Sequence, residues 1–150
     1  MRIIVGGESR KSGKTTAVCR IIAAFPDAGW TAVKISPHLH CDAGSAWSLT
    51  EDGTSGDTRR YLEAGARRAL LYCGPVEYGL DSLLELLATA KNWIVETTSA
   101  AALLPHDLAI LMAAPAGASA KSGLSDFPPH VRIHASDDAL ADLVHRHWKA

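Results

Sequence analysis

The fold is decided by the stretch Ile3-Ile4-Val5-Gly6-Gly7 and, after four intervening residues, by Ser12-Gly13-Lys14-Thr15-Thr16. The apolar run predicts a buried strand, and the second run predicts a loop that leads into a helix. Backbone N–H groups of such a loop converge on an anion. A lysine at this place reaches the β- and γ-phosphates of a nucleotide, and the hydroxyl after it coordinates Mg²⁺. The stretch therefore predicts a nucleotide-binding phosphate loop.

The loop departs from the usual pattern G-x-x-x-x-G-K-[ST] at its first glycine. Counting back from Gly13, that glycine falls at position 8, where this chain has Glu8. Either the loop is one residue longer, counted from Gly7, or it carries a carboxylate at that position. Arg10 and Lys11 would offset the carboxylate. The simpler alternative is a turn that caps an ordinary helix, with Ser12 at the N-cap.

Length and composition describe one domain, residues 1–150, with 47% hydrophobic and 21% charged residues. The net charge of −1 gives no reason to expect nucleic acid or a membrane surface as a partner. The three cysteines, Cys19, Cys41 and Cys73, are odd in number and form no Cys-x-x-Cys pair, which is typical of free thiols in a reducing compartment. No signal peptide or membrane span is evident, so a cytoplasmic protein is expected.

Apolar runs alternate with segments of helical periodicity along the whole chain. Strands are expected at 2–6, 30–36, 69–73, 92–96, 107–113 and 131–135, and helices at 13–25, 57–66, 80–91 and 138–148. Residues 43–56 and 114–129 are rich in small and polar residues and are expected to be loops. This order predicts a three-layer α/β fold of the P-loop NTPase kind, with a mostly parallel sheet and helices on both faces.

Two strand ends carry polar residues where a ligand binds in an open α/β sheet. The strand 30–36 contains Lys34 and is followed by His38, His40 and Asp42, which would form either a polar loop beside the phosphates or a metal site. The strand 92–96 ends in Glu96, which would hold a Mg²⁺-bound water or orient a nucleophile. An exposed strand-end glutamate is the simpler alternative for that residue.

Four features, in order, resemble the molybdopterin-guanine dinucleotide biosynthesis protein B (MobB) family of small GTP-binding P-loop proteins. They are Ser12-Gly13-Lys14-Thr15-Thr16 after the first strand, Val33-Lys34-Ile35-Ser36-Pro37-His38, Asp57 with Arg59 or Arg60 through Glu63-Ala64-Gly65-Ala66, and Ile94-Val95-Glu96. The resemblance covers about the first two-thirds of the chain. Thr97 stands where the family has glycine after the glutamate, and the chain from Ala113 onward has no counterpart in the family pattern.

The resemblance implies binding and slow hydrolysis of GTP (or ATP) with Mg²⁺, in an accessory protein of molybdenum cofactor biosynthesis. It implies a homodimer that works with the molybdopterin cofactor and its guanylyltransferase. The expected metal residues are Thr15, Glu96 and Asp42, and Lys14 and Glu96 would act in hydrolysis. Lys34, His38 and Asp57 would line the cargo side. The expected phosphate-binding residues are Lys11, Ser12, Gly13, Lys14, Thr15 and Thr16.

Two other functions fit the same sequence. In a small-molecule kinase, which would resemble the adenosylcobinamide kinases, Arg59, Arg60 or His40 would orient an acceptor hydroxyl. In a phosphate-binding module without hydrolysis, Glu8 would have spoiled the nucleotide geometry, because a carboxylate beside a triphosphate costs about a few kcal/mol.

Overall fold

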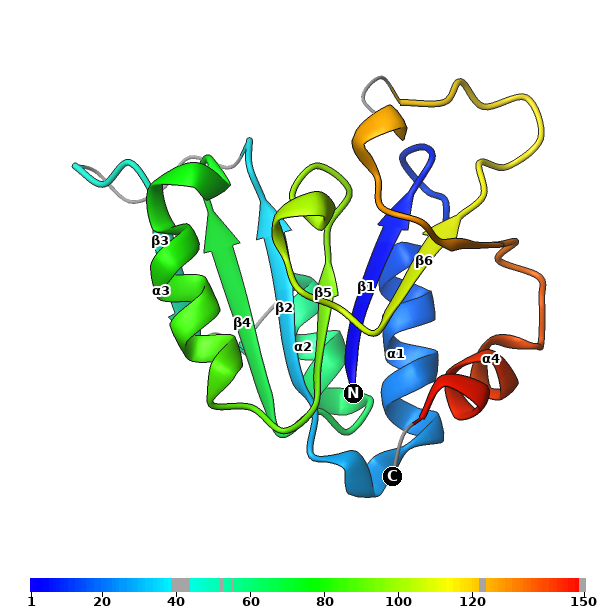
Figure 1. Cartoon of the computed structure of the whole chain (residues 1–150), viewed down its shortest axis with the longest axis horizontal. Coiled ribbons are helices and arrows are strands. Elements are labelled where there is room, and N and C mark those ends of the chain that lie inside the picture. The colour runs from blue at the N-terminus through cyan, green and yellow to red at the C-terminus, as the bar shows by residue number, and fades with distance from the viewer. Residues whose placement is uncertain (39–43, 52, 55, 122–123, 149–150) are drawn as a thin grey trace.

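The computed structural model describes residues 1–38, 44–51, 53–54, 56–121 and 124–148. Its centre is a seven-stranded sheet in the order β3-β4-β2-β5-β1-β6-β7 (Figure 1). Every neighbouring pair runs parallel except β3 and β4, which are antiparallel. The strands are β1 (Arg2–Gly7), β2 (Thr31–Ser36), β3 (Ser48–Glu51), β4 (Arg68–Cys73), β5 (Trp93–Glu96), β6 (Leu108–Met112) and β7 (Val131–Ile133).

Helices cover both faces of the sheet, because each central strand is apolar on both sides. In β1, Ile3 and Val5 pack toward α1 (Lys14–Ala24), α2 (Gly56–Glu63) and α4 (Leu140–His147). Ile4 packs on the opposite face, toward α3 (Val76–Ala88). Figure 1 shows α3 in front of the sheet and α1 and α2 behind it. The expected three-layer α/β fold with a mostly parallel sheet is confirmed.

The expected loop 43–56 was wrong in part, because it contains the edge strand β3. This strand has only four residues, Ser-Leu-Thr-Glu, and is held by antiparallel pairing with β4 rather than by an apolar run. Trp47 precedes it and stacks on Tyr72 with ring centroids 5.8 Å apart. Trp47 therefore anchors this segment to the sheet.

Several element boundaries also differ from the sequence expectation. Helix α3 begins at Val76, four residues earlier than expected, and departs from helical geometry at Gly79. There the backbone N–H donates to the Tyr72 hydroxyl at 2.9 Å. Helix α2 ends at Glu63, and Gly65 follows with a φ of 112° that favours glycine. Strand β7 ends at Ile133 and helix α4 begins only at Leu140.

The structure also bears on two expectations that came from composition, the state of the cysteines and the lack of a membrane span. Cys19 is a free thiol, Cys73 is buried at the end of β4, and Cys41 lies outside the described residues. Within the described part of the chain, no helix combines the length and the apolar character that a bilayer crossing requires.

The sheet register brings the expected site residues to one edge. Glu96 of β5 lies opposite Val5 of β1 on one side and opposite Lys34 of β2 on the other. Lys34 and Glu96 alternate with Val33 and Val95, which face α3, so both polar side chains point toward α1 and α2. The carboxyl ends of β1, β2 and β5 therefore form the floor of a site beneath the head of α1.

Candidate functional site

The loop 8–13 connects β1 to α1 and turns sharply at its end. Gly13 has a φ of 90°, which a side chain would strain, and Lys11 has a φ of 59°. Gly7 allows the loop to fold back over the strand, because a Cβ there would lie 2.1 Å from the Ser12 Oγ. Lys14 Nζ reaches back over the loop to the Ser9 carbonyl oxygen, at 3.4 Å. The loop thus closes around a small space at the helix start.

Ser12 lies beneath this loop rather than in front of it. Its side chain is 1% exposed, and Oγ finds no hydrogen-bond partner among the described residues. The expected N-cap role does not hold, since α1 begins after Gly13 without a side-chain cap. Four N–H groups at a helix start lack an internal partner, so the head of α1 is available to an anion.

Glu96 is the hub of the site and is only 3% exposed. Its Oε2 lies 2.9 Å from the Thr15 Oγ1, at the first turn of α1. Lys34 Nζ donates to the Oε1 at 3.2 Å, and the Tyr61 hydroxyl of α2 donates to the Oε2. The alternative of an exposed strand-end glutamate is therefore wrong. A buried carboxylate requires such partners, since an unpaired one is costly.

Helix α2 supplies a second carboxylate beside Lys34. Asp57, in its first turn, pairs with Lys34 Nζ. Burial alone would lower the pKa of Lys34, but the Glu96 and Asp57 carboxylates raise it above its usual value, so its ammonium stays charged. Burial, with the Glu96 charge, raises the pKa of the Tyr61 phenol, which keeps its proton and acts as a donor.

These side chains open on a cleft with two connected parts. The first, about 440 Å³, lies at the head of α1, and the second, about 780 Å³, extends over the ends of β2 and β5. Both parts are lined by Lys14, Lys34 and Glu96. Among the described residues that line the cleft, two are acidic, Glu96 and Asp126, whereas six are cationic: Arg10, Lys11, Lys14, Lys34, Arg60 and Lys121. The chain as a whole carries a net charge of −1, so positive charge is concentrated here.

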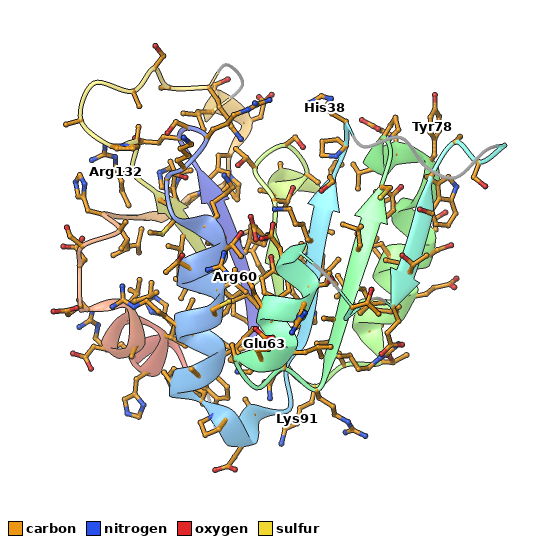
Figure 2. All side chains as sticks on the ribbon, turned by 180° about the vertical axis from the view of Figure 1, so that it is seen from behind. His38, Arg60, Glu63, Tyr78, Lys91 and Arg132 are labelled. Atoms are coloured by element: carbon orange, nitrogen blue, oxygen red, sulfur yellow. The ribbon has the colours of Figure 1, made fainter. Side chains whose placement is uncertain are left out.

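The neighbouring cations affect the pKa of Lys14. Burial lowers the pKa of this ammonium, and the nearby Lys121 charge lowers it further, with Glu96 acting in the opposite direction. On the other wall, the Arg60 Nη2 donates to the Thr16 Oγ1 at 3.2 Å. Figure 2 shows Arg60 between α2 and α1. An anion in the cleft would relieve the repulsion among these cations.

The Glu8 carboxylate turns away from this cleft, and Glu8 lines neither part of it. Its Oε2 accepts from the Ala114 N–H at 2.8 Å and from the Arg132 Nη2 at 3.0 Å. Figure 2 shows Arg132 on the side of the molecule beyond α1. The hydrogen bonds from Arg132 and from the Ala114 backbone lower the pKa of Glu8 to about 2. The reason to expect that Glu8 spoils anion binding is thereby removed.

The structure brings most of the expected site residues together. Lys11, Gly13, Lys14, Thr15, Thr16, Lys34 and Glu96 line the part of the cleft at the α1 head, and His38 lines the part over β2. His38 is labelled at the end of β2 in Figure 2. Arg59 does not reach the cleft, since it pairs with Glu63 on the surface. Asp42 and His40 lie outside the described residues.

The donor set suits one kind of metal. The Thr15 hydroxyl and the Glu96 carboxylate are oxygen ligands, which Mg²⁺ prefers. No cluster of three or more histidine, cysteine, aspartate or glutamate side chains occurs in the described ranges, which leaves His38 without described companions for a zinc site. The residues therefore fit a magnesium ion that shares its ligands with an anionic substrate.

Two site residues were missed from the sequence, Tyr61 and Lys121. Tyr61 follows Asp57 by four residues, so both lie on one face of α2, and this spacing would have found it. Lys121 comes from the long segment after β6, where no local sequence pattern predicts that its side chain points into the cleft.

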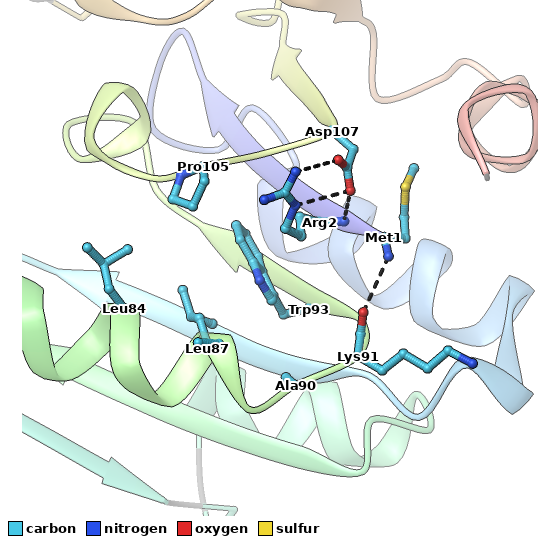
Figure 3. Close-up of a pocket in the computed structure, with 10 residues that line it drawn as sticks. Met1, Arg2, Leu84, Leu87, Ala90, Lys91, Trp93, Pro105 and Asp107 are labelled. Atoms are coloured by element: carbon cyan, nitrogen blue, oxygen red, sulfur yellow. Dashed lines mark hydrogen bonds and ion pairs between the residues drawn. The ribbon is translucent and has the colours of Figure 1, made fainter. Parts of the chain in front are cut away.

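A separate cavity of about 540 Å³ lies at the opposite end of the sheet (Figure 3). Leu84, Leu87 and Trp93 line it beside the ion pair of Arg2 with Asp107, which is 2.7 Å long. None of the expected site residues lines it.

Comparisons with models of protein families, with curated proteins and with solved structures found no match to this chain.

Proposed function

We propose that the protein binds a nucleoside triphosphate with Mg²⁺ in this cleft, with GTP preferred over ATP, and hydrolyses it slowly. The observation that carries the proposal is the hydrogen bond between Thr15, at the head of α1, and the buried Glu96, beside the folded-back Lys14. These groups combine a cation, a helix start and a hard-metal ligand pair within one cleft of positive charge.

In this proposal, different residues bind different phosphates of the nucleotide. The backbone of the loop 8–13 and Lys14 bind the β- and γ-phosphates, and Thr16 lies at the α-phosphate. Thr15 and Glu96 hold Mg²⁺, which neutralises charge on the phosphate oxygens when bound. Lys34, fixed between Glu96 and Asp57, holds the Glu96 carboxylate in place beside Thr15.

The choice of GTP, a homodimer and a role in molybdenum cofactor biosynthesis rest on the resemblance to the MobB family. In that role the molybdopterin cofactor and its guanylyltransferase are partners. The cargo would lie in the part of the cleft over β2, near His38. Cytoplasmic location is proposed on a separate ground, the odd number of cysteines without a Cys-x-x-Cys pair.

The test is a thermal-shift titration with GTP and ATP, with and without Mg²⁺, on the parent, on Lys14→Ala and on Lys91→Ala. Lys91 lines the cavity at the opposite end of the sheet and serves as the matched control. A ligand at one hundred times its Kd adds about 2.7 kcal/mol of stability. For a chain of this size that is a rise in Tm of about 5–10 °C. A shift that Lys14→Ala abolishes and Lys91→Ala retains supports the proposal, and no shift with any nucleotide refutes it.

A second candidate, a small-molecule kinase, is favoured by one observation. The cleft continues past Lys14 and Glu96 over the ends of β2 and β5, where Ser36, His38 and Thr98 line it. This extension has room for an acceptor beside the terminal phosphate. Transfer of labelled phosphate from the nucleotide to a panel of hydroxyl-bearing metabolites tests it, whereas release of phosphate to water alone favours hydrolysis.

A further inference from the structure

Glu8 is tied to the segment 114–132 at three points. Its carboxylate accepts from the Ala114 N–H where the segment begins and from the Arg132 guanidinium where it ends. Its backbone carbonyl accepts from the Lys121 N–H, midway along the segment. One residue of the loop 8–13 thus contacts three residues that lie more than one hundred positions later, and we call these three contacts of Glu8, with Ala114, Lys121 and Arg132, the clasp.

This clasp places the Lys121 side chain at the cleft. Lys121 lines the larger part together with Lys14 and Arg10. Its charge is near enough to Lys14 to lower the pKa of that residue. No ion pair within the described part of the chain neutralises Lys121. An anion between the two ammonium groups would relieve their repulsion.

We propose that Lys121 is a second phosphate-binding cation of the site, and that Glu8 is the positioning residue that holds it there. This inference rests on the proposed function and names the terminal phosphate of the triphosphate as the group that Lys121 contacts. Glycine at position 8 would supply neither the bond to Ala114 nor the pair with Arg132. The Glu8 carboxylate then supports anion binding, because it helps to hold Lys121 at the cleft.

The electrostatics agree with this assignment. The Glu8 charge is matched by Arg132, so the carboxylate adds no repulsion toward a bound phosphate. Lys121 and Lys14 approach from different elements, the segment 114–132 and the head of α1, and so reach one anion from two sides. The γ-phosphate, which a triphosphate has and a diphosphate lacks, is the group that we assign to both cations.

The first experiment measures Kd for Mg²⁺ with a slowly hydrolysed GTP analogue and for Mg²⁺ with GDP. The variants are Lys121→Met, Lys14→Ala and the charge-matched control Lys91→Met. A hydrogen bond to a charged group has a strength that corresponds to about tenfold in Kd. We expect Lys121→Met to weaken the triphosphate about tenfold and the diphosphate less than twofold, with Lys91→Met unchanged. Equal weakening of both nucleotides, or of neither, overturns the assignment of Lys121.

The second experiment tests whether Glu8 acts through Lys121. Glu8→Ala removes the two side-chain contacts, to Ala114 and Arg132, and keeps the backbone bond to the Lys121 N–H. We therefore expect it to weaken the triphosphate by part of the loss that Lys121→Met causes, and the double variant to be no weaker than Lys121→Met alone. Additive losses overturn the positioning role. Glu51→Ala, which removes another surface carboxylate paired with an arginine, is the control. Hydrogen exchange at the Ala114 amide, faster in Glu8→Ala than in Glu8→Gln, reports the clasp without nucleotide.

The two proposals fail in different ways. If the parent binds no nucleotide, or if Lys14→Ala binds as the parent does, the proposed function falls and this inference with it. If the parent binds and Lys14→Ala does not, while Lys121→Met keeps its triphosphate affinity, only the role of Lys121 falls.

Discussion

Replacement of Lys34 by methionine tests the buried charge network directly. Methionine keeps much of the side-chain length but leaves the Glu96 carboxylate, which is 3% exposed, without its ammonium partner 3.2 Å away. Loss of one partner of a fully buried ion pair costs about 3–5 kcal/mol. Lys34 is 25% exposed, and Glu96 keeps its bonds to Thr15 and Tyr61. We therefore expect a smaller loss, about 2 kcal/mol in the free energy of unfolding.

Urea denaturation at pH 7 measures this loss, and the expected fall in Tm is about 4–8 °C. The carboxylates raise the pKa of Lys34 above its usual value of 10.5, so its contribution is complete below that pH and is lost only as pH rises through the raised value. The difference between the parent and Lys34→Met should thus be constant from about pH 6 to 9. Lys91→Met, at an exposed lysine, should change stability by less than about 0.5 kcal/mol.

The double variant Lys34→Met with Glu96→Gln separates charge from packing. A glutamine accepts hydrogen bonds from Thr15 and Tyr61 but carries no charge that needs Lys34. It should therefore recover about half of the loss that Lys34→Met causes. A single variant that loses less than about 0.5 kcal/mol, or a double variant that loses the sum of both singles, would refute the coupling inferred from the structure.

Other predictions concern the neighbours of this network. Tyr61→Phe removes the hydroxyl that donates to the buried Glu96 and should cost about 1–3 kcal/mol by urea denaturation; no loss would show that the bond is not formed in solution. The pKa of Glu8 is lowered from 4.5 to about 2, so its stabilising effect is present above 4.5 and lost as pH falls through 2. The stability curves of the parent and of Glu8→Gln should therefore differ at pH 6 and converge near pH 2. Gly7→Ala places a Cβ 2.1 Å from the Ser12 Oγ and should cost about 1–3 kcal/mol and weaken nucleotide binding; an unchanged Kd would show that the loop adapts.

The fold was predictable because its strands are buried on both faces. Ile3-Ile4-Val5 and Leu108-Ala109-Ile110-Leu111-Met112 are continuous apolar runs, which only a covered parallel sheet accommodates. Strand β3 was not predictable for the opposite reason. Its residues Ser48–Glu51 are half-buried or exposed, and pairing of the backbone with β4 supplies most of their order.

The candidate site was predictable as a set of strand and helix ends, but not as a network. The sequence places Lys34 and Glu96 near the ends of two strands, whereas their contact depends on β2 and β5 being neighbours in register. The role of Tyr61 depends on which face of α2 meets the sheet. Asp57 already pointed to that face, since the two residues are one helical turn apart.

Glu8 shows most clearly why a departure from a motif is hard to interpret without strand order. Arg132 of β7 lies opposite Leu111 of β6, and Leu111 lies opposite Gly6 of β1, so the three residues form one line across the sheet. Glu8 is two residues beyond Gly6 and returns to the same side of an extended chain. The register therefore carries its carboxylate to Arg132, 124 residues away in sequence. In the sequence alone, the nearest cations are Arg10 and Lys11, and they suggest a partner on the wrong side of the loop.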